Sequence, residues 1–363
     1  MNSLPIDIAT VCFDVQELYY LPQYLPIHHE LIKRGKGNTA FIFYHGKFDA
    51  IIENIIEKEN LNSVWVDNQS EANNYYQAKK ADWVFFSNIF PFLDDVHGVS
   101  KSAQIGHGIG AKASYYTQSD TATTVRFVEG KYKTNRLKSM YPSNQFIDAG
   151  FCKLDSIFNG DTCGSNLKGL GLDSSKKTIL YAPTFYPSSI ERFPKNFPED
   201  FQEFNILIKP HYFSLSKEKY KGQRKLLEHW AKYANVYLAK IDDYSLVPFM
   251  ATADLLISDT SSAIIEFAVL DKPVIWCNFL KLRWTYRGFF SFRFKKRMDK
   301  DYQEYSKVAV RSDSYKMLIN NVSEQMLNPK ALSDQRLRYA EKMAGVLDGK
   351  ASERIVDYLL DNK

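Results

Sequence analysis

The chain of 363 residues contains little cysteine and no long apolar run. Its four cysteines are scattered and form neither a Cys-x-x-Cys pair nor a Cys/His ligand spacing; they are Cys12, Cys152, Cys163 and Cys277. This distribution argues against a disulfide framework or a zinc site and favours a reduced, cytoplasmic setting. No stretch approaches the roughly 18 apolar residues of a membrane span, and the first residues lack a basic segment followed by an apolar run. We therefore expect neither a membrane span nor a secretory signal.

The composition also excludes long disordered regions. Hydrophobic residues make up 45% of the chain and aromatic residues 15%, including 25 Phe and 23 Tyr. Disordered chains lack this much apolar surface, which offsets the loss of chain entropy on folding. The length is sufficient for two compact domains.

The two halves of the chain differ in charge. The first 172 residues carry 16 Lys and Arg against 18 Asp and Glu, whereas the remaining residues carry 31 against 24. Within the basic half, residues 281–300 contain eight Lys and Arg, one acid (Asp299) and six interleaved aromatic residues. This segment is a candidate for contact with a polyanion or an anionic surface.

Short β-rich apolar runs alternate with helical patterns, which predicts βαβ units and mostly parallel sheets. The strands predicted in the first half are Ile6–Phe13, Thr39–Tyr44, Ser63–Val66, Trp83–Ser87, Ser102–Ile105, Val125–Val128 and Gln145–Ile147. The helices predicted there include Tyr24–Arg34, Phe48–Lys58 and Lys131–Met140. The strands predicted in the second half are Thr178–Ala182, Asn205–Lys209, Val236–Ala239, Leu255–Ser258, Val274–Cys277 and Val308–Val310.

Residues 159–177 are rich in Gly, Ser and Asp and have no apolar period, which predicts a linker. We therefore predict an α/β fold of two Rossmann-like, doubly wound domains, residues 1–172 and 173–335, facing each other across a cleft. The last residues, 336–363, have a helical pattern and are expected to pack back on the N-terminal domain. Ligands in such sheets bind at the carboxyl ends of the strands.

The stretch from Leu255 to Trp276 predicts a strand, a polar turn and a helix that ends near Leu270. The turn holds Asp259, Thr260, Ser261 and Ser262, and free amides at the start of a helix together with hydroxyls form a good site for a diphosphate. A simple helix cap is the alternative. Glu266, one turn into the helix, is either close to a ribose hydroxyl or an ordinary solvated helix residue.

Two further strand ends carry polar residues beside a proline. In Ile206-Leu-Ile-Lys-Pro-His211, Pro210 ends the strand, so that Lys209 and His211 lie at its carboxyl end. Both side chains stabilise added negative charge, which suits a phosphoryl group. Thr184 follows Pro183 in the same way and offers a hydroxyl. The alternative is a surface lysine and a loop histidine.

In the first half, His107 stands between Gly106 and Gly108 after a predicted strand. The small neighbours leave its side chain accessible, as a general base requires. The stretch Gly106 to Ala111 also comes near the Gly-x-Gly-x-x-Ala dinucleotide pattern, but it lies outside the opening βαβ unit and has no clear acidic partner.

Residues 283–297 combine cations with aromatic rings and are predicted to contact an anionic membrane surface or another polyanion. The residues proposed for this contact are Arg283, Trp284, Arg287, Arg293, Lys295, Lys296 and Arg297. Binding of single-stranded nucleic acid, or a structural role in which the phenylalanines belong to the core, are the alternatives.

Taken in order, these stretches resemble the CDP-glycerol glycerophosphotransferase family, the teichoic-acid and capsule polymerases with a GT-B type fold. The resemblance runs from about His107 to the carboxyl terminus. It is carried by His107-Gly108 with Lys112, Tyr181–Thr184, Lys209–His211, Ser258–Ser262 through Glu266 to Asp271-Lys-Pro273, and the closing Asp348–Arg354.

The resemblance implies a role for each of these residues. His107 would be the base that deprotonates the acceptor hydroxyl, and His211 would assist at the phosphate. Lys209, Thr260, Ser261 and Ser262 would hold the diphosphate of a CDP-activated polyol, with Thr184, Asp259 and Glu266 on the same donor side. Gly108 and Lys112 would lie on the acceptor side, in the N-terminal domain.

The implied reaction transfers a phosphopolyol from CDP-glycerol or CDP-ribitol to a hydroxyl of a lipid-linked or polymeric glycan, with release of CMP. No bound cofactor is expected, no nucleic acid partner is expected, and no Asp-x-Asp pair predicts a metal. The implied location is cytoplasmic, peripheral on the inner face of the cell membrane. Two alternatives stay open, a UDP-type sugar transferase or epimerase on the same fold and a non-catalytic membrane-associated scaffold of polysaccharide assembly.

Overall fold

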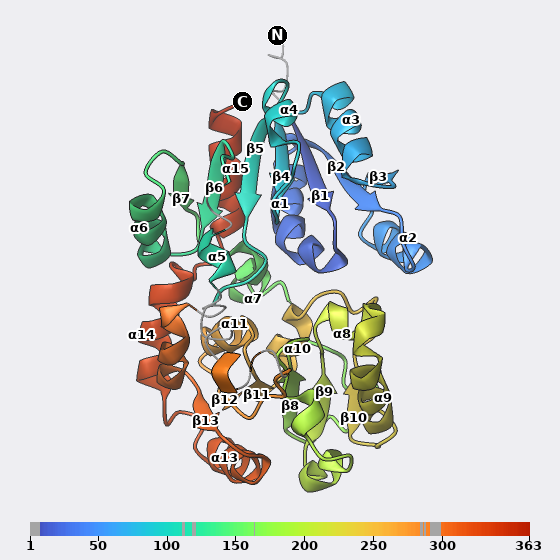
Figure 1. Cartoon of the computed structure of the whole chain (residues 1–363), viewed down its shortest axis with the longest axis vertical. Coiled ribbons are helices and arrows are strands. Elements are labelled where there is room, and N and C mark those ends of the chain that lie inside the picture. Colours follow the sequence, from blue (N-terminus) through green and yellow to red (C-terminus); the bar gives the residue numbers. More distant parts are fainter. Residues whose placement is uncertain are drawn as a thin grey trace. The chain divides into compact units, whose positions relative to one another are not determined.

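The computed structural model describes residues 8–110, 113–117, 121–162, 164–283, 286, 288–290 and 299–363. The chain divides into two compact units (Figure 1). Unit 1 comprises Met1–His107, Tyr115–Asn159 and Gly345–Lys363, and unit 2 comprises Gly108–Ser114 and Gly160–Ala344. Each unit is built on its own parallel sheet flanked by helices, so the α/β fold with two doubly wound sheets is confirmed.

The sheet of unit 1 has seven strands in the order β3-β2-β1-β4-β5-β6-β7, and every pair is parallel. The strands are β1 (Ala9–Val15), β2 (Gly37–Tyr44), β3 (Ser63–Val66), β4 (Trp83–Phe86), β5 (Lys101–Ile105), β6 (Val125–Val128) and β7 (Phe146–Asp148). The strand order reverses between β1 and β4, and ligands of doubly wound sheets bind at such a switch point.

Helices connect these strands, as right-handed crossovers between parallel strands require. They are α1 (Leu21–Lys33), α2 (Asp49–Lys58), α3 (Gln69–Lys79), α4 (Leu93–His97), α5 (Ser114–Thr117), α6 (Lys131–Met140) and α7 (Asp155–Phe158), with short 3-10 turns at Leu18–Tyr20 and Cys152–Leu154.

The last helix of the chain, α15 (Ala351–Asp361), belongs to unit 1 and contacts α1. Arg34 at the end of α1 bonds Asp357 at 2.5 Å, and the indole N–H of Trp83 donates to the carbonyl of Leu359 at 3.3 Å. The Asp155 carboxylate accepts from the backbone amides of Ala351 and Ser352 at 3.2 and 2.7 Å, which caps the start of α15. The predicted return of the chain end to the N-terminal domain is confirmed.

The sheet of unit 2 has six strands in the order β10-β9-β8-β11-β12-β13, again all parallel. The strands are β8 (Thr178–Ala182), β9 (Asn205–Ile208), β10 (Val236–Leu238), β11 (Leu255–Ser258), β12 (Val274–Cys277) and β13 (Val310–Ser312). β8, β9, β11 and β12 are buried along their whole length, as strands covered by helices on both faces must be. The switch point of this sheet lies between β8 and β11.

The helices of unit 2 are α8 (Tyr212–Ser216), α9 (Lys221–Trp230), α10 (Val247–Thr252), α11 (Ala263–Ala268), α13 (Tyr315–Leu327) and α14 (Ser333–Ala344). Its 3-10 segments are Ile190–Arg192, Phe197–Phe201, Glu218–Tyr220, Gly288–Phe290 and Lys300–Lys307. Aromatic and aliphatic side chains from the strands, α9 and α13 form one core, in which the ring of Tyr181 stacks on Phe193 at 4.7 Å.

The unit boundaries fall after Asn159 and after Ala344, whereas the sequence places them after residues 172 and 335. Part of the predicted linker is tied to unit 2, since the amide of Ser165 donates to the Thr252 hydroxyl at 2.6 Å. The predicted helical segment 336–363 is two helices, α14 and α15. Helix α14 stays with unit 2 because the buried guanidinium of Arg336 forms an ion pair with Asp271 at 2.9 Å.

Candidate functional site

Three of the predicted polar motifs follow adjacent strands of unit 2, because β9, β8 and β11 are neighbours. Backbone hydrogen bonds continue past the strand ends. The amide of Lys209 donates to the carbonyl of Tyr181 at 2.9 Å, and the amide of His211 donates to the carbonyl of Pro183 at 3.1 Å. Parallel strands end at the same edge of the sheet, so Lys209, His211 and the Asp259–Ser262 turn lie along one edge, at the switch point of unit 2.

Asp259 holds this edge together. Its carboxylate is fully buried and accepts from the amides of Thr184 and Ser189 at 2.8 and 3.0 Å, and from the Ser189 hydroxyl at 3.0 Å. These bonds fasten the loop after β8 to the end of β11. Asp259 therefore helps to position this loop, and its predicted place on the phosphate-binding side of the site stays a prediction.

Three other predicted donor-side residues are also buried. Thr184 is 2% exposed and Glu266 is 0% exposed, so the interpretation of Glu266 as a solvated helix residue is wrong. The Thr184 hydroxyl has no hydrogen-bond partner among the described residues. The Thr260 hydroxyl donates to the carbonyl of Pro187 at 3.4 Å, which ties the turn to the same loop.

Ser261 and Ser262 are the hydroxyl residues of the turn that reach the surface, since both are half-buried. The Ser261 hydroxyl accepts from the amide of Ala263 at 3.3 Å, at the start of α11. The predicted strand, turn and helix are confirmed, with the helix at Ala263–Ala268. The first amides of α11 already have partners, because Ala263 donates to the Ser261 hydroxyl and Ile264 and Ile265 donate to the carbonyls of Ser261 and Ser262. The dipole of the helix is what adds to the attraction for an anion.

The imidazole of His211 has a defined hydrogen-bonding state. His211 is the N-cap residue of α8, and its Nδ1 accepts from the amide of Phe213 at 3.1 Å. An amide can only donate, so Nδ1 carries no proton, and the proton of the neutral ring is on Nε2. The ring therefore offers an N–H donor, which suits a phosphate oxygen.

Residues that the sequence did not single out hold His211 in place. Its ring packs on Phe185 and Phe213 at centroid distances of 4.6 and 5.1 Å. The buried Gln223 of α9 donates to the carbonyl of Phe185 at 3.0 Å and accepts from the Ser214 hydroxyl of α8 at 2.8 Å. Gln223 thus joins the helix that His211 caps to the loop that covers its ring. No local sequence pattern marks this contact.

In unit 1, His107 follows β5 and its ring makes the opposite hydrogen bond. Nδ1 lies 3.4 Å from the carbonyl oxygen of Ser87, which follows β4. A carbonyl can only accept, so Nδ1 carries the proton and Nε2 keeps a lone pair. The backbone carbonyl of His107 accepts from Gln23 at 3.3 Å. A half-buried imidazole with its proton on Nδ1 has its basic lone pair on Nε2, which is the form that a general base requires.

Three tyrosine rings contact the imidazole of His107, and the sequence analysis missed them. Tyr19, Tyr20 and Tyr115 lie at centroid distances of 5.5, 5.3 and 5.6 Å. Burial is the main cause that raises the pKa of Tyr19 and of Tyr20, so both phenols stay neutral. The Leu-Tyr-Tyr sequence after β1 is the only local sign of this contact. Nothing in it indicates that these rings meet His107, which follows β5 about 80 residues later.

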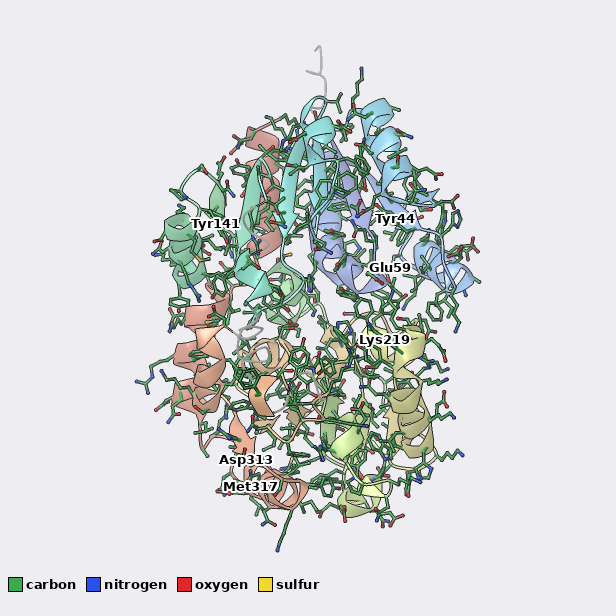
Figure 2. The ribbon with its side chains drawn as sticks, viewed as in Figure 1. Tyr44, Glu59, Tyr141, Lys219, Asp313 and Met317 are labelled. Carbon is green, nitrogen blue, oxygen red and sulfur yellow. The ribbon has the colours of Figure 1, made fainter. Side chains whose placement is uncertain are left out.

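A buried carboxylate lies near the end of β1, beside the switch point of unit 1. Asp14 Oδ2 accepts from the Tyr76 hydroxyl at 2.7 Å and from the Tyr44 hydroxyl at 2.8 Å. Tyr44 is labelled in Figure 2. Burial raises the pKa of Asp14 to about 6, because two neutral hydroxyls stabilise the charge less than water does.

Of the predicted site residues not yet placed, the structure describes Gly108 and Arg283. Gly108 is buried and belongs to unit 2, whereas His107 belongs to unit 1. Arg283 is exposed, and its guanidinium carbon lies 4.3 Å from the centre of the Tyr186 ring. Lys112, Trp284, Arg287, Arg293, Lys295, Lys296 and Arg297 lie outside the described residues.

The described part of the chain has neither a metal-ligand cluster nor a membrane-spanning helix. No group of three or more His, Cys, Asp or Glu side chains there could hold a metal ion. No helix there is both long and apolar enough to span a membrane.

The sequence matches a known protein family. Residues 96–361 match the model of the family described as CDP-Glycerol:Poly(glycerophosphate) glycerophosphotransferase, which is most of the chain. The chain belongs to this family. The predicted resemblance is confirmed, and the matched region includes His107, His211 and the Asp259–Ser262 turn.

Curated glycerophosphotransferase relatives act in teichoic acid synthesis. The chain is 32% identical over 114 residues to a teichoic acid glycerol-phosphate primase of Bacillus subtilis (31% of this chain, 29% of the relative). It is 26% identical over 199 residues to a teichoic acid poly(ribitol-phosphate) polymerase of Bacillus spizizenii (51% of this chain, 28% of the relative). The matches thus span about a third or less of these relatives' length.

Solved structures share the fold. The wall teichoic acid polymerase TagF superposes with a TM-score of 0.68 at 15% identity, covering 97% of this chain and 88% of that chain. A structure from Listeria monocytogenes described as a putative UDP-N-acetylglucosamine 2-epimerase gives a TM-score of 0.65 at 11% identity, covering 96% of this chain and 95% of that chain. Both likenesses concern the two-sheet α/β architecture, and such an architecture does not by itself determine the reaction.

Proposed function

We propose that this glycerophosphotransferase transfers glycerol phosphate, or ribitol phosphate, from a CDP-activated donor to a hydroxyl of a teichoic-acid-type or capsule polymer, with release of CMP. The observation that carries the proposal is the opposite hydrogen bonding of two histidines. His107 presents a lone pair on Nε2, and His211 presents an N–H. Transfer of a phosphoryl group to an alcohol needs a base for the alcohol and donors for the phosphate.

The donor diphosphate is proposed to bind at the switch point of unit 2. The hydroxyls of Ser261 and Ser262, the ammonium of Lys209 and Nε2–H of His211 are the donors at this edge. Thr260 and Asp259 support them through the loop after β8. Thr184 and Glu266 lie under this surface, and contact of Glu266 with the ribose stays a proposal.

In the proposed step, a lone pair of the acceptor hydroxyl oxygen attacks the β-phosphorus of the CDP-polyol. The new P–O bond forms as the bond from that phosphorus to the bridging oxygen of CMP breaks, and the electron pair leaves with CMP. The hydroxyl proton passes to Nε2 of His107. Lys209 and His211 stabilise the charge that develops on the departing phosphate.

The Ser87 carbonyl contributes to this step through His107. When Nε2 takes the proton, the ring becomes a cation with N–H groups on both nitrogens. The carbonyl that accepts from Nδ1 then stabilises the cation, and the three tyrosine rings fix the ring plane. Gly108 and Lys112 are proposed to lie beside the acceptor.

The acceptor is proposed to be a lipid-linked or polymeric glycan at the inner face of the cell membrane, reached from the cytoplasm. The basic segment 283–297 is proposed to hold the protein at this anionic surface. Neutralising Arg293, Lys295, Lys296 and Arg297 together is expected to weaken binding to anionic vesicles in a salt-dependent way, and unchanged binding would remove the segment from this role.

Calorimetric titration tests the donor class. The purified protein is titrated with CDP-glycerol, CDP-ribitol, CDP, CMP, a UDP-sugar and NAD. Selective binding of the cytidine nucleotides is the expected result. Preference for the uridine nucleotide would instead favour the sugar transferase or epimerase alternative, and binding of no nucleotide would favour a scaffold.

A further inference from the structure

A hollow with charged side chains around it lies in unit 2, beside helix α14. The cavity measures about 390 Å³ and is bounded by helix α14 and the end of the 3-10 segment Lys300–Lys307. The described residues that line it are Lys307, Gln335, Arg338, Tyr339 and Lys342. Cavities of this size accept small ligands or a single unit of a polymer.

Three of these five lining residues are cations, and none is acidic. Gln335, Arg338 and Lys342 are separated by one helical turn each, so they share a face of α14. All three are exposed, as is Lys307, whereas Tyr339 is buried beneath them. The ammonium of Lys342 lies 5.7 Å from the centre of the Tyr339 ring, so this ring forms part of the floor.

Arg338 is the strongest anion donor of the group. Its Nε donates to the backbone carbonyl of Asp334 at 3.2 Å, one turn earlier on α14. That bond orients the guanidinium, and its two terminal amino groups have no partner among the described residues. A guanidinium held in this way presents a planar pair of donors, the geometry that binds two oxygens of one phosphate.

We propose that this cavity, which we call the α14 site, binds a phosphodiester group of an anionic polymer or of an anionic lipid. Arg338 binds two phosphate oxygens, and Lys307 and Lys342 contribute further positive charge. The three cations suit a polymer that carries one negative charge in each repeating unit better than a ligand with a single carboxylate. The identity of the polymer rests on the proposed function, since its acceptor and its product both carry phosphodiesters.

A double variant with a charge-matched control tests the α14 site. Arg338→Gln/Lys342→Gln removes two cations from the site, and Lys225→Gln/Lys316→Gln removes two exposed lysines from α9 and α13 of the same unit. The probes are a glycerol phosphate oligomer, vesicles of phosphatidylglycerol with phosphatidylcholine, and vesicles of phosphatidylcholine alone. Binding of the full chain is measured by thermophoresis at several salt concentrations.

The site variant is expected to bind one anionic probe at least about tenfold more weakly than wild type, with a shallower salt dependence. The control is expected to bind like wild type. Loss for the oligomer identifies a polymer ligand, and loss for the anionic vesicles identifies a lipid headgroup. No loss with either probe, or an equal loss in the control, would overturn the proposal.

A conservative variant separates phosphate recognition from general charge. Arg338→Lys keeps the positive charge and loses the planar donor pair, so it is expected to bind more weakly than wild type but better than the double variant. Binding equal to wild type would contradict the role of the guanidinium. None of these measurements needs turnover, and cytidine nucleotide titration of the same variants reports separately on the donor site.

Discussion

His107 and His211 each follow a buried strand, in unit 1 and unit 2, and their rings differ in what Nδ1 does. In His107, Nδ1 donates to the backbone carbonyl of Ser87; in His211, Nδ1 accepts from the backbone amide of Phe213. The first arrangement leaves a lone pair on Nε2 and the second leaves an N–H. The comparison teaches that one backbone contact decides whether a histidine can act as a base or as a hydrogen-bond donor.

Two buried aspartates show the same effect of local partners. Asp14 of unit 1 accepts from the hydroxyls of Tyr44 and Tyr76, whereas Asp259 of unit 2 accepts from two backbone amides and from the Ser189 hydroxyl. Amides at a strand end fasten a loop to that strand. The partners of Asp14 are tyrosine hydroxyls from β2 and α3, and burial beside them raises the pKa of this carboxyl.

The largest expected effect is the loss of turnover when the proposed base, His107, is removed. His107→Ala is expected to lower kcat by about 10³-fold, since a positioned general base contributes roughly 10²- to 10⁴-fold. Binding of CDP-glycerol should change little, because the base acts on the acceptor. Steady-state kinetics and calorimetry on the same preparation measure both, and near-normal turnover would exclude His107 as the base.

Asp14 should make stability depend on pH. Its folded-state pKa of about 6 lies above the ordinary value of 3.8, so the folded chain holds this proton more tightly than the unfolded chain. Its contribution is therefore fully present below pH about 4 and falls by about 3 kcal/mol as the pH rises through 6. The carboxylate is buried, so solvent screening does not reduce this figure.

Denaturant unfolding of wild type and Asp14→Asn between pH 4 and 7 measures this term. Other groups titrate equally in the two proteins, so the difference between their unfolding free energies isolates Asp14. The variant is expected to lack the fall between pH 4 and 6. Parallel curves would show that the tyrosine hydroxyls compensate for the buried charge.

His211→Asn separates the cap from the phosphate donor. Asparagine still caps α8, so the melting temperature should change little, while the loss of Nε2–H should lower kcat by about 10²-fold. His211→Ala, which loses both, is expected to destabilise the chain by about 1 kcal/mol as well. Equal melting temperatures for the two variants would argue against the cap, and wild-type turnover in His211→Asn against the phosphate contact.

The smallest expected effect concerns one hydroxyl of the turn. Ser261→Ala should raise the KM for the CDP-polyol about tenfold and leave kcat nearly unchanged, because a hydrogen bond to a charged group contributes about 1.5 kcal/mol or more. Ser323→Ala, on the exposed face of α13, is the matched control. Equal KM values for the two variants would remove Ser261 from the donor site.

The central strands were predictable because their apolar runs are long enough to be buried on both faces. β8, β11 and β12 have the predicted bounds. β13 begins two residues later than predicted, because Val308 and Ala309 are buried in a turn whose amides donate to the carbonyl of Tyr305. Apolar residues that are buried in a turn give the same sequence pattern as apolar residues that are buried in a strand.

The end of α14 could not be predicted from helical periodicity. Gly345 adopts a φ of +75°, and a Cβ there would lie 2.7 Å from the Cα of Gly130. A glycine just after a helix is a common local stop signal, so Gly345 itself marked the end of α14. The sequence does not show that a turn more than 200 residues earlier comes close to the same backbone. That close approach is a tertiary contact, and no local signal records it.

The sequence by itself determined the α/β class, the strand ends that carry Lys209, His211 and Ser261, and the family, since these depend on apolar periodicity and short motifs. Tertiary structure decided the proton positions on His107 and His211, the loop-holding role of Asp259 and the α14 site. Each of these depends on a group that another segment or a folded turn brings within hydrogen-bonding distance, and a one-dimensional pattern contains no distances.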